Sequence, residues 1–287
     1  MLLKNEPFEG QGKKSSRPVL PLEKQGTVAV IGPLGNTRSN MPGTWSVAAR
    51  LDDYPSLYEG LKEMTAGRVN ITYAKGSNLI GDVAYEERAT LFGRSLSRDN
   101  RTDKELLDEA LKVASGADVI VAALGESSEM SGESSSRTDL DIPDVQRTLL
   151  EALLKTGKPV VLTLFTGRPL TLTWEQEHVP AILNVWFGGS EAAYAIGDVL
   201  FGDVNPSGKL TMTFPKNVGR YLYSITTRIP VARWLPAIGS RSSAATIWMW
   251  TMNRCIPSDT DSHTPLSSTA TSPSVPRSWD KMAPPLP

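Results

Sequence analysis

Hydrophobic residues between positions 24 and 215 follow two alternating patterns, which together predict an α/β fold. Short runs of consecutive apolar residues are typical of strands buried on both faces of a parallel sheet, and they alternate with stretches of helical periodicity. The predicted strands are 27–32, 69–76, 118–125, 159–167 and 181–189. The predicted helices are 54–67, ending at Gly67 as C-cap, 103–118, 144–159 and 190–202. Strands joined by helices of this length form right-handed βαβ units, so we predict a parallel-sheet α/β sandwich with helices on both faces.

The pattern stops before the end of the chain. Residues 221–287 contain 28 Ser, Thr or Pro among 67 residues, no glutamate and a single glycine, yet they hold four of the seven tryptophans. Disordered linkers are usually poor in aromatic residues and rich in charged ones, so this segment is not an ordinary linker. It shows neither strand nor helix periodicity, and we predict that 220–287 is a disordered tail.

Composition and charge exclude several classes of function. The net charge of −1 gives no basic face for nucleic acid, and no apolar run is long enough to span a membrane, so neither is expected as a partner. One cysteine, Cys255, and two histidines make a metal site of His and Cys improbable, and no cofactor is expected. The first residues show no apolar core of a signal peptide, which predicts a cytoplasmic chain if it is made as given.

Candidate chemistry is concentrated in the loop 125–143, GESSEMSGESSSRTDLDIP, directly after the predicted strand 118–125. Ligands of such sheets bind beyond the carboxyl ends of the strands. The loop contains Glu126, Glu129 and Glu133, followed by Arg137 and Asp139. One interpretation is a solvated polar loop in which Arg137 and Asp139 pair with each other. The other is a site whose glutamate projects into a cleft as a proton donor.

Other motifs are absent or weak. The loop 31–46 is rich in Gly, Pro and Asn but lacks the spacing of the common nucleotide-binding fingerprints. No G-x-S-x-G turn occurs, and His178 lies in a polar stretch, so a Ser-His-Asp hydrolase is not expected.

A series of motifs in a fixed order resembles glycoside hydrolase family 3, and within it the bacterial periplasmic β-glucosidase type. The motifs are LLKN (2–5), VAVIGPL (28–34), GTWS (43–46), YAKG (73–76), the loop 125–143, TGKPVVL (156–162), GRPL (167–170) and WFGGSEAAYAIGDVLFGDVNPSGKLTMTFP (186–215). The resemblance covers about residues 2–219. It implies that 24–219 is the second, C-terminal α/β domain of such an enzyme, after a leading segment 1–23.

The resemblance also implies a mechanism and residues for it. The family is retaining and uses two carboxylates, a nucleophile and an acid/base. SGE at 131–133 followed by Arg137 is similar to the acid/base motif, which makes Glu133 the acid/base, with Glu126 as the rival and Arg137 as a substrate-binding residue. The nucleophile is an aspartate on a barrel, which we expect this chain to lack and an upstream gene to encode.

Two functions therefore remain open. The first is a fragment of a retaining β-glucosidase, whose substrate is a β-glucoside or an oligosaccharide and whose parent is periplasmic or secreted. The second is a non-catalytic α/β module that binds carbohydrate or a protein partner.

The resemblance offers an explanation for the unpatterned tail. In family members FP-x-x-VG is followed by a segment similar to QIPLFYNHKNTGRPL. One nucleotide spelling of that segment, read one base later, gives RYLYSITTRIPVARW, which is residues 220–234. We therefore expect a frameshift near Gly219 and Arg220, in the gene or in its sequencing.

Overall fold

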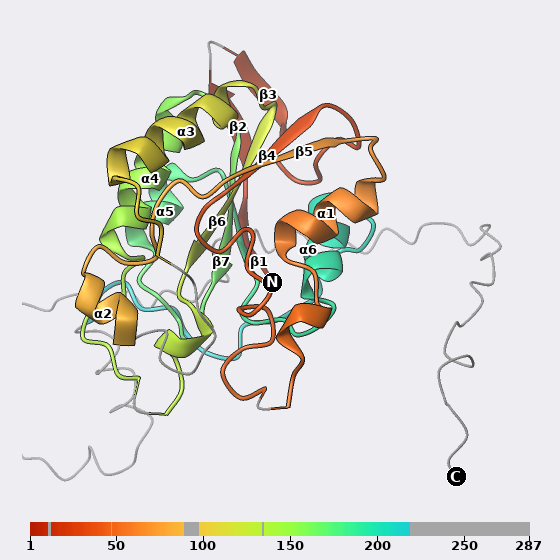
Figure 1. Cartoon of the computed structure of the whole chain (residues 1–287). Helices are drawn as coiled ribbons and strands as arrows, with labels where there is room; N and C mark the ends of the chain where they lie inside the picture. The colour runs from red at the N-terminus through yellow and green to blue at the C-terminus, as the bar shows by residue number, and fades with distance from the viewer. Residues whose placement is uncertain (11–12, 47, 89–97, 134, 219–287) are drawn as a thin grey trace, which may run out of the picture. The chain divides into compact units, whose positions relative to one another are not determined.

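The structure of the chain is a computed structural model that describes residues 1–10, 13–46, 48–88, 98–133 and 135–218 (Figure 1). The predicted tail 220–287 and the predicted frameshift lie outside the described residues. The centre of the fold is a six-stranded sheet in the order β1-β8-β7-β6-β4-β5. In this order the strands are β1 (Leu2–Asn5), β8 (Ala181–Asn184), β7 (Val160–Phe165), β6 (Val119–Gly125), β4 (Thr27–Ile31) and β5 (Asn70–Ala74).

The sheet is parallel except at one edge. Strands β4 to β8 pair in parallel, which confirms the predicted fold class. Strand β1 pairs antiparallel with β8, with Leu2 opposite Leu183 and Asn5 opposite Ala181. This edge strand lies outside the range 24–215 for which a parallel sheet was predicted, and the sequence did not predict it, because a strand of four residues is too short to show a period.

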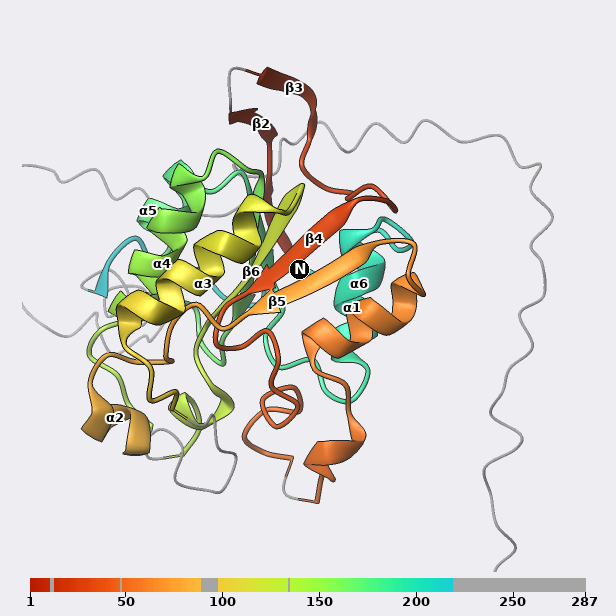
Figure 2. The ribbon, with the colours of Figure 1, turned by 45° about the horizontal axis from the view of Figure 1, so that its top comes forward.

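Helices cover both faces of the sheet, as predicted. Figures 1 and 2 show α1 and α6 on one face and α3, α4 and α5 on the other. Their bounds are α1 (Leu57–Thr65), α3 (Asp103–Ser115), α4 (Asp144–Lys155), α5 (Thr173–His178) and α6 (Ala192–Leu200). Three short elements lie outside these two layers: α2 (Val83–Arg88), η1 (Leu51–Asp53) and η2 (Ser128–Met130). The sequence did not predict α2 or α5, which have only six residues each and no clear periodicity.

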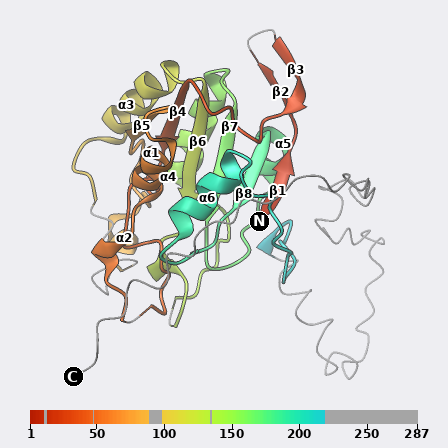
Figure 3. The same ribbon diagram turned by 90° about the vertical axis from the view of Figure 1, so that its right-hand side faces the viewer.

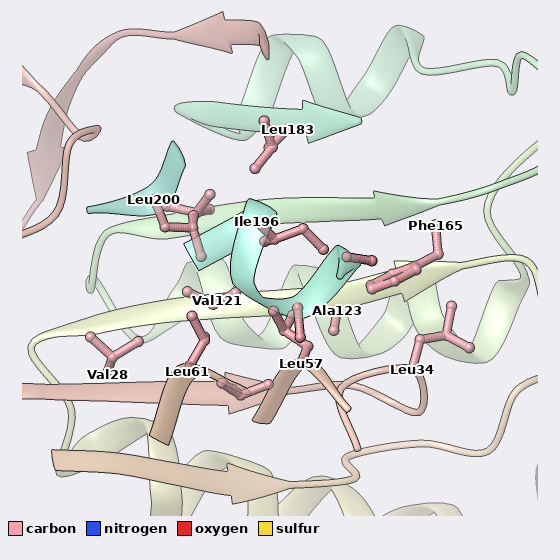
Figure 4. Close-up of a cluster of buried hydrophobic side chains, with 14 of the residues drawn as sticks. Val28, Leu34, Leu57, Leu61, Val121, Ala123, Phe165, Leu183, Ile196 and Leu200 are labelled. Atoms are coloured by element: carbon pink, nitrogen blue, oxygen red, sulfur yellow. The ribbon is translucent and has the colours of Figure 1, made fainter. Parts of the chain in front are cut away.

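Each central strand contributes to two hydrophobic clusters because successive side chains of a strand point to opposite faces. On β6, Val121 and Ala123 join the cluster under α1 and α6, whereas Ile120 and Ala122 join the cluster under α3 and α4. Figure 4 shows the first cluster, in which Leu57 of α1 lies among the strand residues. Full burial of a Leu, Ile or Val side chain contributes about 1.5–3 kcal/mol, so the two clusters hold the helices against the two faces of the sheet.

The helix ends follow from local sequence. Helix α1 begins after Ser56, whose side chain accepts from the backbone N–H of Glu59 while the Glu59 carboxylate accepts from the Ser56 N–H. Its C-cap is Ala66, in the left-handed conformation with φ 47°, so the predicted cap at Gly67 was one residue late. Gly67 follows with φ 79°, and the chain therefore takes two consecutive left-handed residues to leave the helix.

One strand is shorter than predicted, and the leading segment contains strands that the sequence did not predict. The strand predicted at 181–189 ends at Asn184, because Trp186 has a φ of 53° that turns the chain out of the sheet. The leading segment 1–23 contributes β1 and a separate hairpin of β2 (Pro7–Gly10) and β3 (Lys13–Pro18). Figure 3 shows this hairpin extending away from the main sheet.

Candidate active site

The loop that follows β6 has a buried part and an exposed part. Residues 125–131, which we call the stem, are buried, and they include the short helix η2. Gly132 and Glu133 are exposed, and we call the described residues 132, 133, 135 and 136 the tip. Because β6 lies at the centre of the sheet, the loop emerges at the carboxyl edge, where ligands of parallel sheets bind.

Glu126 is the centre of the stem. Its side chain is fully buried, and its Oε1 accepts from Arg137 Nη1 at 2.8 Å. Its Oε2 accepts from the Thr166 hydroxyl at 2.8 Å, and its backbone N–H donates to the Phe165 oxygen at 2.8 Å. Arg168 Nε forms an ion pair with Oε1 at 3.2 Å. Both carboxylate oxygens are therefore engaged by groups of the fold itself.

The Arg137 side chain packs against the stem rather than lying on an open surface. Its side chain is 7% exposed, and besides Glu126 it contacts the backbone oxygen of Asp141, to which Nη2 donates at 3.1 Å. The alternative pairing with Asp139 is not formed: the Asp139 carboxylate accepts from the backbone N–H of Asp141 at 2.8 Å instead. The predicted contact of Arg137 with substrate stays a prediction.

Arg168 connects the stem to the tip. Its Nη2 donates to the backbone oxygen of Met130 and to that of Ser135, the latter at 2.7 Å. The residue lies just after β7, and its own backbone N–H donates to the Thr166 hydroxyl at 3.1 Å. The sequence interpretation named neither Arg168 nor Thr166 as part of the site. Their position directly after a buried strand, beside the strand that carries the loop, is the signal that could have found them.

A second loop supports the stem from the side. The Thr44 hydroxyl contacts the Ser131 backbone oxygen at 2.6 Å and the backbone oxygen of Ser128. Asn40 Oδ1 accepts from the Ser128 N–H at 2.6 Å. This is the Gly/Pro/Asn-rich loop 31–46, whose contribution to the site was also missed, because hydrogen bonds to backbone groups leave no recognisable spacing in the sequence.

The stem is also fixed from the side of α4. Gln146 is fully buried; its Oε1 accepts from the Gly125 N–H at 2.8 Å, and its Nε2 donates to the Gly125 oxygen at 2.9 Å. The same amide nitrogen donates to the Leu79 oxygen at 2.7 Å. Gln146 therefore pairs with both backbone groups of the residue at which the strand becomes the loop.

A second buried carboxylate lies on α5. Glu175 is fully buried and pairs with Arg147 Nη2 at 2.8 Å, and the Arg147 guanidinium lies over the Trp174 ring at 4.3 Å from its centroid. Burial raises the pKa of Glu175 above its ordinary value, although the charge of Arg147 acts in the opposite direction. Burial also raises the pKa of Asp141, and the nearby Asp139 adds to that shift.

Glu133 differs from Glu126 and Glu175 because it is exposed at the tip. The backbone around it is held by the contacts of Met130 and Ser135, but its side chain is open to whatever faces the carboxyl edge. An exposed carboxyl on a fixed backbone has the geometry that a proton donor to a second surface requires.

The described part of the chain lacks the features of two other classes of protein. Among residues 1–218, outside the gaps given above, no cluster of three or more His, Cys, Asp or Glu side chains could hold a metal ion. None of the helices described there combines the length and the apolar character needed to cross a bilayer.

Comparison with known proteins places the chain in one family. The model of the glycosyl hydrolase family 3 C-terminal domain matches residues 1–245, and the chain belongs to this family. It is 44% identical over 207 residues to the periplasmic beta-glucosidase of Salmonella typhimurium, which covers 72% of this chain and 27% of that protein. It is 37% identical over 213 residues to a beta-xylosidase of Formosa agariphila, again 72% of this chain and 27% of the relative.

A solved structure agrees with the sequence relatives. The beta-glucosidase of Listeria innocua in complex with isofagomine superimposes with a TM-score of 0.61 at 32% identity, over 76% of this chain and 26% of that one. The chain thus spans about a quarter of the length of these relatives. The resemblance inferred from the sequence motifs is confirmed at the level of the family.

Proposed function

We propose that this domain supplies the acid/base carboxylate of a retaining β-glucosidase, and that this carboxylate is Glu133. The observation that carries the proposal is the contrast within one loop: Glu133 is exposed at the carboxyl edge, whereas its rival Glu126 is fully buried and bonded to Arg137 and Thr166. A general acid must reach the leaving oxygen of a substrate, and Glu126 has no path to one.

The retaining mechanism assigns the rest of the chemistry. Two carboxyl groups about 5–5.5 Å apart flank the glycosidic bond; one attacks the sugar and the other protonates the leaving oxygen, then activates water. In the proposed arrangement Glu133 does the second task, and the nucleophile comes from outside the described residues, on a barrel domain. The names of the relatives favour a β-glucoside as the substrate and the periplasm as the compartment.

A hybrid enzyme tests the proposal. The segment of the Salmonella relative that this chain matches is replaced by residues 1–218 of this chain, so that the rest of the relative supplies what this domain lacks. Glu133→Gln should lower kcat on alkyl β-glucosides by about 10²–10⁴-fold, because their leaving groups need protonation. Dinitrophenyl β-glucoside should still react in the first step, and azide should restore turnover because it needs no general base.

Glu126→Gln is the matched control, since it makes the same change in the same loop. It should destabilise the hybrid, and its dependence on the leaving group should be far weaker than that of Glu133→Gln, because the Glu133 carboxyl is still present. If Glu126→Gln shows that dependence and Glu133→Gln does not, the acid/base is Glu126. If neither does, the loop supplies no proton, and the non-catalytic carbohydrate- or partner-binding module is the better interpretation.

A further inference from the structure

One side chain connects the end of the stem to the tip. Arg168 Nη2 donates to the backbone oxygens of Met130 and Ser135, which lie on either side of Glu133 in the sequence. We propose that Arg168 is a positioning residue, which restricts the backbone of the tip and thereby places the Glu133 carboxyl. This inference rests on the proposed function of Glu133 and adds to it a residue that does not touch the reacting atoms.

The contact between Arg168 and the stem is buried. Arg168 Nε lies 3.2 Å from Oε1 of Glu126, whose side chain is fully buried, and the Arg168 side chain itself is only 19% exposed. Glu126 is tied in turn to the end of β7 through Thr166 and the backbone oxygen of Phe165. The tip is therefore connected to the central strands of the sheet through a short series of bonds.

Arginine suits this task better than lysine. The planar guanidinium holds its donors in a fixed fork, so Nη2 can reach the two carbonyl oxygens while Nε stays beside the carboxylate. A lysine ammonium is a single flexible point, and it cannot keep all three partners at these positions. Arg168→Lys therefore preserves the charge while removing the geometry.

Placement matters because catalysis depends steeply on it. Functional groups must stay within about 0.5 Å of the productive geometry, and a misplacement of about 1 Å costs on the order of 100-fold in rate. Among the described residues, the Ser135 N–H reaches the Gly132 oxygen at 3.4 Å, and the Ser135 hydroxyl lies 3.0 Å from the Glu129 oxygen and 3.4 Å from the Glu133 oxygen. The Thr44 hydroxyl contacts the Ser131 oxygen at 2.6 Å, but unlike Arg168 it does not reach the other side of Glu133.

Arg147 provides a matched control for Arg168. Its side chain is 23% exposed and pairs with a fully buried glutamate, Glu175, at 2.8 Å. Its guanidinium, however, lies over the Trp174 ring on α5 rather than against the loop tip. Arg147→Lys should therefore make the same replacement, of a mostly buried arginine paired with a buried glutamate, without changing the contacts of the tip.

The first experiment measures amide hydrogen exchange in the full chain, followed by mass spectrometry of the peptide that spans 130–137. Arg168→Lys should raise exchange in this peptide by about tenfold or more over wild type, the factor expected from losing one hydrogen bond to a charged group. Arg147→Lys should leave it unchanged. Unchanged exchange in Arg168→Lys, or an equal rise in both variants, would contradict the proposal that Arg168 restricts the backbone of the tip.

The second experiment uses the hybrid enzyme and a readout that general loss of stability does not move. Arg168→Lys should lower kcat on alkyl β-glucosides by a larger factor than on dinitrophenyl β-glucoside, with little change in KM, and Arg147→Lys should show no such difference. If Glu133→Gln depends on the leaving group and Arg168→Lys does not, the positioning role is wrong and the proposed function stands. If Glu133→Gln shows no such dependence, the proposed function fails, and the positioning role fails with it.

Discussion

The stem and the tip of one loop place the same residue type in opposite surroundings. Glu126, in the stem, is fully buried and bonded to Arg137, whereas Glu133, in the tip, is exposed. Both are glutamates with serines nearby, and both follow a glycine. The difference shows that the position along the loop, rather than the residue type or its neighbours in sequence, decides which carboxylate can do chemistry.

The two surroundings have different energetic consequences. A buried ion pair is costly to desolvate and is tolerated only where each charge is fully paired, so removal of one partner leaves an uncompensated charge. An exposed carboxylate has no such cost, and most surface substitutions change stability by less than about 0.5 kcal/mol. The stem therefore contributes to the stability of the fold, and the tip is free to serve a site.

Exchange of the two glutamates for glutamine should show the largest contrast. Glu126→Gln leaves Arg137 and Arg168 without their carboxylate, and we expect a loss of about 3–5 kcal/mol in the free energy of unfolding. Glu133→Gln should change it by less than about 0.5 kcal/mol. Urea denaturation of the two variants measures both values. Similar losses would show that the tip is as much a part of the folded structure as the stem.

Two glycines of the loop allow a finer comparison. Gly125, in the stem, has φ 126° and Gly132, in the tip, has φ 130°, so alanine is strained at both. A Cβ at 125 would lie 2.0 Å from the backbone oxygen of Phe165, which cannot move without breaking the sheet, whereas a Cβ at 132 would meet Thr44 Cγ2 at 3.0 Å.

Gly125→Ala should therefore cost about 3 kcal/mol or more, and Gly132→Ala about 1–2 kcal/mol from backbone strain alone. Thermal unfolding of both variants, monitored by circular dichroism, tests the difference. Equal shifts in Tm would mean that strain rather than the contact with β7 decides the cost.

The sequence predicted most of the fold for a clear physical reason. Strands β4, β6 and β7 are almost continuous apolar runs, and α3 and α4 have an apolar residue at every third or fourth position. The hydrophobic pattern of the sequence is therefore enough to identify them. Strand β1 was missed because its four residues carry no period, and its place depends on pairing with β8, which is distant in sequence.

The site could be predicted only in part. The position of the loop follows from the rule for parallel sheets, and the choice of Glu133 came from the resemblance to a family. What separates Glu126 from Glu133 is burial, which depends on Arg168 and Thr166 from the next strand along. Contacts between segments so far apart in sequence cannot be read from one sequence, and the contacts of Arg168 with backbone oxygens depend on no particular residue type at 130 or 135.

The smallest expected effect concerns Glu175, which like Glu126 is fully buried but lies outside the loop. Burial raises the pKa of Glu175 in the folded state above its ordinary value, so the folded protein holds this proton more tightly than the unfolded chain does. The free energy of unfolding contributed by this group should then fall as the pH rises from the ordinary pKa of glutamate, about 4.3, through the raised value, and stay level above it.

Glu175→Gln cannot titrate, so the stability of wild type relative to this variant should decrease across that window. Glu177→Gln, at an exposed position of the same helix, should keep the wild-type profile. Urea denaturation at a series of pH values from 4 to 8 measures these differences, and a relative stability that rises with pH would show that pairing with Arg147, rather than burial, dominates the titration of Glu175.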